Sequence, residues 1–550
     1  MKSYLLTWFG MTDFRAAKNC RAAKEEGDKS KGIQDGPIFA ALKEHPYTDV
    51  LIMCPVIEND GEQNTVEGHK ILLDSLKERM EKYMVDHKDR ESVTIKGIPC
   101  TLANINDYEH MKSSVVEALR RYDSVTDPKL LSVYLSPGTT LMAYAWSEAL
   151  RQYPHIDAKI LVSPREDAET RVVDTRGTAL KGDGNFIDDY EYDAIFHLFS
   201  ENKIPNLLAL KQFSKCKKHI FLTDEKMPAS SMRVLVKDYA KEFASIENID
   251  PNNPRSVFKT VSRHLDKYKE KYKGNLGFNV TGGTKPMMAG ALDVCRAYGI
   301  VPFYYGRKLI DFTNGDKKVA ACLDNVNEIV KLNMDRELTF EDATETEGSF
   351  NIAKKIVENR GLIERHYKYL NESAQNRNPL EICEKNIEIR WAENEPAYLR
   401  LRDKEIINGK FSDFPRFISG GWLELYVYSQ LMPLKDDGLI KDIRLNYTVK
   451  YENNKYNEAD VLFTDGQKLY FVECKAGEVK LDAIDKVKNT AAALGGVKAV
   501  PIIVAATVFE PTKIPEVRQR KMKNLGIELI KGDDIDIPRL TEKFRNIIGV

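Results

Sequence analysis

The first half of the chain alternates short apolar segments with longer stretches of helical character. Strands that alternate with helices in this way predict α/β units built on a parallel sheet. The expected strands lie at residues 4–9, 49–54, 131–135, 159–162, 194–199, 219–223, 276–280 and 300–305.

Two segments of this half repeat one pattern. Val133–Met142 and Phe278–Met287 each read as an apolar strand, a small polar turn and the start of an alanine-rich helix. The first copy is looser, because Pro137 replaces a glycine and Thr140 stands where the second copy has Lys285. The repeat predicts two Rossmann-like domains in tandem.

The chain divides into four predicted parts, because 550 residues exceed what one core holds. A stretch at 177–189 with glycines, charges and little apolar content suits a linker between the two Rossmann-like domains. A charged, helical stretch then predicts a helical connector, and the last part has the order helix, three strands, helix, strand. The predicted boundaries are 1–185, 186–335, 336–405 and 406–550.

The last part contains a predicted hairpin of two apolar runs, Asn457–Phe463 and Leu469–Lys475. They flank Asp465-Gly466, a dipeptide typical of two-residue hairpin turns. This turn would pair Asp460 with Phe471 across the strands.

Three charged residues of the hairpin then share one face, because side chains alternate along a strand: Asp460, Glu473 and Lys475. Two carboxylates and an ammonium group at the end of an apolar hairpin are costly unless something binds there. A divalent metal held by oxygen ligands fits, and it would lower the pKa of a bound water for attack on a phosphodiester. The alternative is an ordinary solvated cross-strand ion pair.

Composition limits the class of protein and the cellular compartment that the sequence predicts. The chain is 42% hydrophobic and 30% charged with a formal charge of -1, so a nucleic-acid enzyme of this kind needs local positive potential. No apolar run is long enough to span a membrane. Eight scattered cysteines without a Cys-x-x-Cys motif argue against a zinc site and predict a reducing cytoplasm.

The hairpin resembles the active site of the PD-(D/E)XK, or restriction-endonuclease-like, nucleases. Asp460, Glu473 and Lys475 fall on that superfamily's Asp, Glu and Lys positions, and Glu424, in a helix after a glycine pair, is a fourth candidate. The resemblance implies that Asp460 and Glu473 hold Mg²⁺ or Mn²⁺, that Lys475 orients the attacking water and that Glu424 supports the metal. An exposed helix acid is the other interpretation of Glu424.

Two further features stay open. Glu458 lies on the same side as Asp460 and either assists a metal or pairs with a lysine. The basic run Arg518–Lys523 either contacts phosphate or is a solvated helix face.

The second Rossmann-like domain resembles a CARF domain, the CRISPR-associated sensor of cyclic oligoadenylates. The resemblance rests on Ser200–Asn206 and Thr223–Lys226, which follow the first two strands, and on the signature Asn279–Met287. Residues 1–185 resemble a divergent second CARF domain, with loops at Trp8–Asp13 and Ser136–Thr140.

The loop at Thr281–Lys285 has glycines, hydroxyls and a lysine between a strand and a helix, which suits the binding of a phosphate. The alternative is a tight turn with a helix cap, which would use the same residue types. The resemblance implies a cyclic oligoadenylate site at Trp8, Gly10, Thr12, Asp13, Ser136, Gly138, Thr139, Asn202, Lys203, Thr281, Gly282, Gly283, Thr284 and Lys285.

From about residue 190 onward the order of domains resembles the CRISPR ancillary nucleases. The expected fold is α/β, with two Rossmann-like CARF domains in tandem, a helical connector and a C-terminal restriction-endonuclease-like domain. The implied function is a cytoplasmic, type III CRISPR antiviral nuclease that nicks or degrades DNA, with RNA as a further substrate, after cyclic tetra-adenylate binds between the CARF domains.

The expected state is a monomer with an intramolecular CARF pseudo-dimer, and a homodimer is the alternative. Two other functions stay open at this point. One is a ligand-sensing, nucleic-acid-binding regulator with an inactive nuclease fold. The other is a constitutive repair or restriction-type endonuclease, which would leave the sensor half unexplained.

Overall fold

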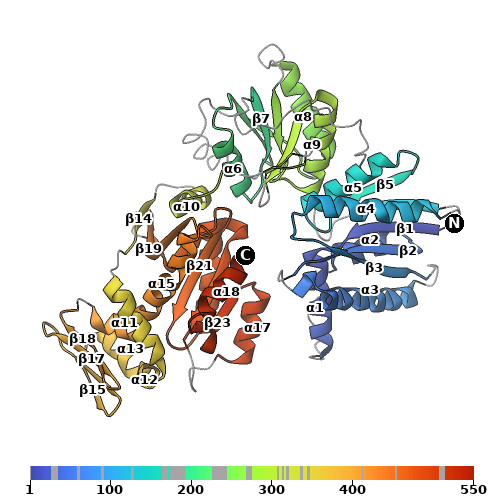
Figure 1. Ribbon diagram of the computed structural model, residues 1–550. Helices are drawn as coiled ribbons and strands as arrows, with labels where there is room; N and C mark the ends of the chain where they lie inside the picture. The colour runs from blue at the N-terminus through green and yellow to red at the C-terminus, as the bar shows by residue number, and fades with distance from the viewer. Residues whose placement is uncertain are drawn as a thin grey trace. The chain divides into compact units, whose positions relative to one another are not determined.

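The computed structural model forms two compact units, Met1–Ala321 and Cys322–Val550 (Figure 1). Among the described residues, no helix has both the length and the apolar character needed to cross a membrane. The eight cysteines are unpaired. The structure describes residues 2–25, 35–58, 62–87, 92–125, 129–163, 171–173, 192–225, 245–267, 275–305, 309–311, 315–317, 321–334, 338–343, 347–411, 413–451, 455–506 and 514–549.

Unit 1 begins with a six-stranded sheet in the order β3-β2-β1-β4-β5-β6, parallel except for β6. Its central strands are buried on both faces, which is why they read as continuous apolar runs. The strands are β1 (Lys2–Trp8), β2 (Asp49–Val56), β3 (Thr94–Thr101), β4 (Lys129–Tyr134), β5 (Ala158–Val162) and β6 (Arg171–Val173). The helices are α1 (Met11–Glu25), α2 (Pro37–Glu44), the 3₁₀ helix η1 (Glu62–Asn64), α3 (Val66–Asp86), α4 (Tyr108–Asp123) and α5 (Thr140–Gln152).

The second part of unit 1 repeats this topology in a seven-stranded sheet of order β13-β12-β11-β10-β7-β8-β9. Helices α8 and α9 pack together on one side of the sheet and α6 lies on the other (Figure 1). The strands are β7 (Ala194–Leu198), β8 (His219–Thr223), β9 (Ser245–Asn248), β10 (Leu276–Asn279), β11 (Val301–Tyr305), β12 (Leu309–Asp311) and β13 (Gly315–Lys317). The helices are α6 (Ile204–Gln212), α8 (Pro254–Lys267) and α9 (Lys285–Tyr298).

The shared strand order confirms two Rossmann-like domains in tandem. The repeat extends to the helix caps: Thr139 Oγ1 accepts from Met142 N at 3.2 Å, and its counterpart Thr284 accepts from Met287 N at 3.3 Å. The predicted linker at 177–189 lies outside the described residues. Strand β3 was not predicted, because Lys96 interrupts its apolar run.

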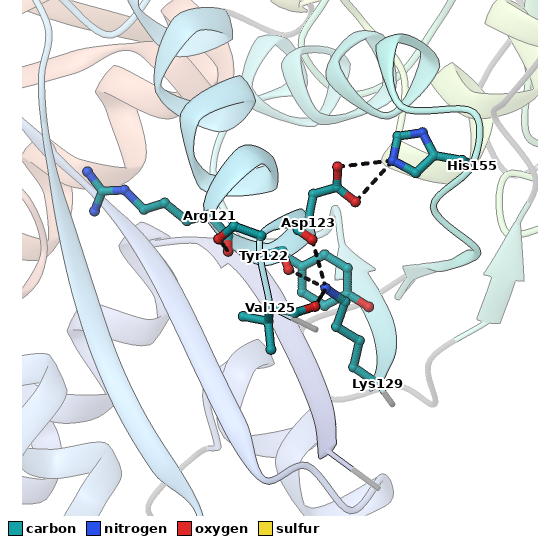
Figure 2. A network of polar contacts seen from close by, with 7 residues as sticks. Arg121, Tyr122, Asp123, Val125, Lys129 and His155 are labelled. Carbon is teal, nitrogen blue, oxygen red and sulfur yellow. Dashed lines mark hydrogen bonds and ion pairs between the residues drawn. The ribbon is translucent and has the colours of Figure 1, made fainter. Parts of the chain in front are cut away.

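The C-terminal end of α4 is held by a lysine from the next strand. The Lys129 ammonium donates to the carbonyl oxygens of Tyr122, Asp123 and Val125 and lies 4.4 Å from the centre of the Tyr122 ring (Figure 2). Asp123 in turn lies 3.0 Å from Nε2 of His155. A cation at this end satisfies carbonyls that have no partner within the helix and complements the helix dipole. The contacts tie α4 to the start of β4, which leads into a predicted ligand loop.

The two domains of unit 1 meet at α5 and α9 through a buried arginine. Arg296 donates to Ser147 Oγ at 3.2 Å and lies 3.6 Å from the Glu148 carboxylate and 3.5 Å from Asp293. Glu148 also pairs with Arg151 at 3.0 Å. In the internal repeat, Glu148 and Arg151 correspond to Asp293 and Arg296. Each domain therefore contributes one acid–arginine pair, and the two pairs meet between α5 and α9.

Unit 2 is built on a six-stranded sheet of order β14-β19-β20-β21-β22-β23, with the last two strands parallel to β21. Its strands are β14 (Thr339–Glu341), β19 (Asp442–Tyr451), β20 (Lys455–Thr464), β21 (Leu469–Lys475), β22 (Val500–Ala505) and β23 (Glu528–Lys531). Its helices are α10 (Val326–Met334), α14 (Phe414–Arg416), the π-helical turn η2 (Phe417–Gly421), α15 (Trp422–Asp436), α16 (Leu481–Gly495), the 3₁₀ helix η4 (Gly496–Lys498), α17 (Glu516–Asn524), the 3₁₀ helix η5 (Gly532–Ile535) and α18 (Arg539–Ile548).

The segment predicted as a helical connector is only partly helical. Helices α11 (Glu347–Glu358), α12 (Arg360–Glu364) and α13 (Tyr367–Asn376) are followed by a four-stranded antiparallel sheet. Its strands are β15 (Leu380–Glu384), β16 (Ile387–Trp391), β17 (Ala397–Leu401) and β18 (Lys404–Gly409). The prediction is wrong for these strands, since their many charged residues hide an alternation in which Leu380, Ile389 and Leu399 face the core.

The segment shares one hydrophobic core with α15 and the large sheet. The units also divide between Ala321 and Cys322 rather than at residue 335, because α10 packs on α16 and β14 pairs with β19.

Replacement of Arg296 tests the junction of the two domains of unit 1. We expect Arg296→Met to lower the free energy of unfolding by about 3 kcal/mol, because it leaves buried Glu148 without its partner on α9. Urea unfolding followed by circular dichroism measures this. The control Arg120→Met breaks an exposed ion pair with Glu117 and should cost less than about 1 kcal/mol. Equal losses in the two variants would contradict the buried junction.

Candidate functional site

The predicted active hairpin forms, with a longer turn than expected. Val461 pairs with Val472 and Thr464 with Leu469, so the loop has four residues instead of two. The Asp465 side chain explains this, because its Oδ1 accepts from the backbone N–H groups of Gln467 and Lys468, each at 2.8 Å. The predicted pairing of Asp460 with Phe471 is therefore wrong by two positions. A shift of two preserves the face on which each side chain lies.

The hairpin brings the three predicted residues together. Lys475 Nζ lies 2.6 Å from Glu473 Oε1, and the backbone N–H of Cys474 donates to Asp460 Oδ2 at 2.6 Å. Glu473 is 9% exposed. Cys474 points to the core, as its alternation predicts. The two carboxylates and the ammonium group thus form one largely buried cluster.

Burial raises the pKa of Asp460, and the neighbouring Glu473 and Glu424 carboxylates raise it further, against the opposing effects of Lys475 and the Cys474 N–H. Burial alone would lower the pKa of Lys475, but Glu473 and Asp460 outweigh it and the net shift is upward. The cluster therefore keeps its ammonium charged and resists the simultaneous ionisation of its carboxylates.

Glu424 lies beside this cluster on α15, where its neighbours Leu423 and Val427 are fully buried. Burial raises the pKa of Glu424, Arg416 and Lys475 act to lower it, and Glu473 acts to raise it. Glu424 is therefore part of the carboxylate cluster, and its interpretation as an isolated exposed helix acid is wrong.

Three further residues lie near the cluster and were not predicted from the sequence: Arg416, Asn446 and Tyr367. Arg416, and the side-chain amide of Asn446 on β19, both act to lower the pKa of Glu424, so both lie near that carboxylate. The ring of Tyr367 lies against the backbone of Gly477, where a Cβ would come within 2.0 Å of the Tyr367 Cζ. Burial raises the pKa of Tyr367, and the nearby Lys475 acts against it. None of the three belongs to a recognisable motif, although the glycine two residues after Lys475 was a signal of close approach.

Glu458 and the basic run Arg518–Lys523 were the two features near the hairpin whose roles stayed open. Glu458 is exposed. In the basic run, Arg518 pairs with Glu478 at 2.6 Å and Lys521 with Asp485 at 2.6 Å, which favours a solvated helix face stabilised by ion pairs.

Within the described residues, no three His, Cys, Asp or Glu side chains are arranged to hold a metal ion together. Two carboxylates that repel each other in a largely buried cluster nevertheless fit a hard cation. Mg²⁺ is typically held by one or two carboxylates while waters and substrate phosphates complete its shell. Asp460 and Glu473 are the residues that match this requirement.

The second Rossmann-like domain brings its two predicted ligand loops into contact. A Cβ on Gly282 would lie 2.5 Å from the carbonyl oxygen of Leu198, so this close approach requires glycine. Asn279 joins the loops, since its amide donates to Pro205 O at 3.1 Å and its oxygen accepts from Thr281 Oγ1 at 2.8 Å.

The other predicted residues of this domain lie around the same loops. Gly283 packs on the Leu198 side chain, and Thr284 caps α9 and donates to Pro251 O at 2.7 Å. Asn202, Lys203 and Lys285 are half-buried, Lys203 and Lys285 at the N-terminal ends of α6 and α9.

The first domain joins its loops in the same way. A Cβ on Gly10 would lie 3.1 Å from Gly138 N, and Gly138 has a φ of +81°, a left-handed conformation that favours glycine. Ser136 is engaged within the domain, with its Oγ 3.0 Å from Ser163 O, and Thr139 caps α5. Thr12 is half-buried.

Two predicted ligand residues of this domain are interior. Trp8 is fully buried and its indole donates to Met142 O at 3.1 Å, and Asp13 is buried with its carboxylate accepting from Ile38 N at 2.8 Å. Both side chains are enclosed within the domain, so their assignment to a ligand site stays a prediction. They support the loop from inside.

The pKa of Asp460 predicts a stability effect. Because that pKa is raised in the folded protein, ionised Asp460 destabilises the fold, and the penalty develops as pH rises from the unfolded to the folded value. In the presence of chelator, Asp460→Asn should raise the melting temperature at pH 8, by about 2–4 °C per kcal/mol relieved, and by less at pH 5. Asp485→Asn, at an exposed ion pair, is the control. An equal or negative shift at both pH values would contradict the prediction.

Comparison with known proteins identifies the two parts of the chain. A family model described as the Card1 CARF domain matches residues 195–342, and one described as the Card1-like endonuclease domain matches residues 412–548. No match was found among curated protein sequences. The second model includes all four candidates of the nuclease cluster, and together the models match more than half of the chain.

Two solved structures share the fold of this chain, and a third similarity is weaker. Can2 from Sulfobacillus thermosulfidooxidans, in complex with cyclic tetra-adenylate, is 19% identical with a TM-score of 0.50 over 65% of this chain and 99% of its own. A Vibrio cholerae protein is 18% identical with a TM-score of 0.51 over 64% and 98%. A type III CRISPR defence DNA nuclease is 13% identical with a TM-score of 0.48 over 95% and 98%. The two family matches show that the chain belongs to the CARF-domain CRISPR ancillary nuclease family, with a Card1-type CARF domain and a Card1-like endonuclease domain.

Proposed function

We propose that the chain is a cyclic oligoadenylate-activated, metal-dependent nuclease of type III CRISPR defence, acting in the cytoplasm. The observation that carries the proposal is the carboxylate cluster of Asp460, Glu473 and Glu424 around Lys475. Such a cluster opposes folding unless it binds a cation, and it lies within the match to an endonuclease domain.

Asp460 and Glu473 would hold Mg²⁺ or Mn²⁺. When bound, the metal lowers the pKa of a water and offsets negative charge on the phosphodiester. Lys475 stays protonated beside Glu473, so it can hold the attacking water by a hydrogen bond and offset charge that develops on the phosphorane. Glu424 orients groups at the edge of the cluster. The intact acid, acid and lysine set favours catalysis over a fold that only binds nucleic acid.

The expected activator is cyclic tetra-adenylate, bound by the loops that follow the strands of the two CARF domains. The glycine-mediated contacts between loops and the N-terminal ends of α6 and α9 supply N–H groups for phosphates. The similar fold of Can2, solved with cyclic tetra-adenylate, agrees with this ring size.

With two CARF domains in one chain and one nuclease cluster, a monomer would nick DNA instead of cutting both strands together. The ligand would activate the nuclease only by binding the active arrangement more tightly. RNA is a further candidate substrate, and a homodimer is the alternative assembly.

Replacing the metal-holding acids tests the nuclease assignment. We expect Asp460→Ala and Glu473→Ala each to lower cleavage of supercoiled plasmid by more than about 100-fold, because each removes a proposed metal ligand. Binding of cyclic tetra-adenylate should stay within about twofold, measured by calorimetry. Asp485→Ala is the matched control. Undiminished cleavage by both variants would rule out the assignment. If the wild-type protein cleaved equally well with and without activator, that result would favour a constitutive nuclease.

The unequal halves of the sensor predict an asymmetric ligand site. Lys285 and Thr140 occupy corresponding positions, but Lys285 is charged and half-buried whereas Thr140 is 7% exposed. Lys285→Ala should weaken cyclic tetra-adenylate binding about tenfold to a hundredfold, the value of a charge-assisted hydrogen bond. Thr140→Ala should change it less than about threefold. Calorimetry on both variants checks this, and equal effects would argue for symmetric contacts.

A further inference from the structure

Strand β19 interrupts its pairing with β20 at one position beside the nuclease cluster. The ladder runs to Leu445 and resumes at Tyr447, with the same register on both sides. That register places Asn446 opposite Asp460, yet the two are not paired. The interruption therefore falls at the central carboxylate of the site.

The backbone of Asn446 is left-handed, with a φ of +49°. Among the described residues, three other residues that are not glycine have a positive φ. Arg377 caps α13, while Asn394 and Arg402 lie in the turns of the small sheet. Asn446 alone in this set lies within a strand. A left-handed residue in a strand is strained, and such strain persists at sites where the surrounding structure requires it.

The other neighbour of β20 also separates at this level. The ladder between β20 and β21 ends at the pair Val461 and Val472. Beyond it, the Asp460 carboxylate accepts the Cys474 N–H at 2.6 Å, so a side chain occupies the place of a ladder bond. Asp460 therefore lies in an opening of the sheet bordered by Asn446 on one side and Cys474 on the other.

Glu424 reaches this opening from α15, whose apolar residues pack on the sheet face that carries Val461, Val472 and Cys474. The charged groups that act on Glu424 are Arg416 of α14, Lys475 and Glu473 of β21 and, across the opening, Asp460 of β20. The uncharged side-chain amide of Asn446 on β19 also lies near Glu424 and acts to lower its pKa. An amide that donates to one carboxylate of a repelling cluster fixes that carboxylate without adding charge.

We infer that Asn446 is a positioning residue of the nuclease site, with two connected actions. Its left-handed backbone opens the sheet beside Asp460, and its side-chain amide holds the Glu424 carboxylate toward the cluster. The inference rests on the proposed nuclease function. The competing explanation is purely conformational, because asparagine tolerates a left-handed backbone better than other non-glycine residues do.

Asn446→Gly separates the two explanations, because glycine keeps the left-handed backbone and removes only the amide. Under activator, we expect its kcat on plasmid to fall about 10-fold to 100-fold while KM changes less than about threefold. Asn446→Asp should be impaired at least as much, since it replaces a donor with a further negative charge. Asn394→Gly, at the matched left-handed asparagine in the small sheet, should leave kcat unchanged. Wild-type kcat in Asn446→Gly would overturn the inference.

A double-mutant cycle with Glu424→Gln tests whether Asn446 acts through Glu424. We expect Asn446→Gly to cost less than about threefold in kcat on the Glu424→Gln background, because the group that it positions is already altered. Fully multiplicative losses would overturn the inference. If Glu424→Gln leaves no measurable rate, the same cycle in free energy of unfolding decides, with additive effects counting against the inference. Failure of wild-type cleavage would instead reject the proposed function.

Discussion

The nuclease domain depends on the repulsion among carboxylates that the fold places in one poorly hydrated cluster. Asp460 and Glu473 lie at the end of an otherwise apolar hairpin, and Glu424 approaches them from α15. Burial disfavours the ionised forms of Asp460 and Glu424, and the neighbouring Glu473 carboxylate disfavours them further. Lys475 offsets part of this cost by pairing with Glu473, and a cation would offset the remainder. Stability of the empty domain and the ability to bind metal are therefore opposed.

The local backbone is shaped to this cluster. The hairpin is regular from its Asp465 turn to Val461, and irregular pairing begins where the carboxylates begin. On one side a carboxylate replaces a ladder bond, and on the other a left-handed asparagine interrupts the strand. Regular pairing would keep the faces of the sheet apart, whereas the opening lets side chains from different elements converge on Asp460.

The segment between the two family matches belongs physically to the nuclease unit. Its helices and its small sheet contribute buried residues to the same core as α15, and Tyr367 lies against Gly477 beside Lys475. The segment is therefore part of the compact nuclease unit instead of a separate connector.

Much of this protein could be predicted from sequence because the signals were local. Continuous apolar runs revealed the parallel strands, the repeated strand–turn–helix pattern revealed the duplication, and the spacing of Asp460, Glu473 and Lys475 revealed one face of a hairpin. A register error of two residues did not matter, since alternation has a period of two.

Only the tertiary structure decided which distant residues join these local patterns. Arg416, Asn446 and Tyr367 come from separate elements and have no motif, so their approach to the cluster depends on packing alone. The small sheet was hidden because charged outward positions mask a short alternation. Trp8 and Asp13 followed the pattern of a ligand loop but turned inward, because burying an indole and capping a helix stabilise the domain itself. The sequence determined local elements and their chemistry, whereas long-range packing decided which side chains face the site.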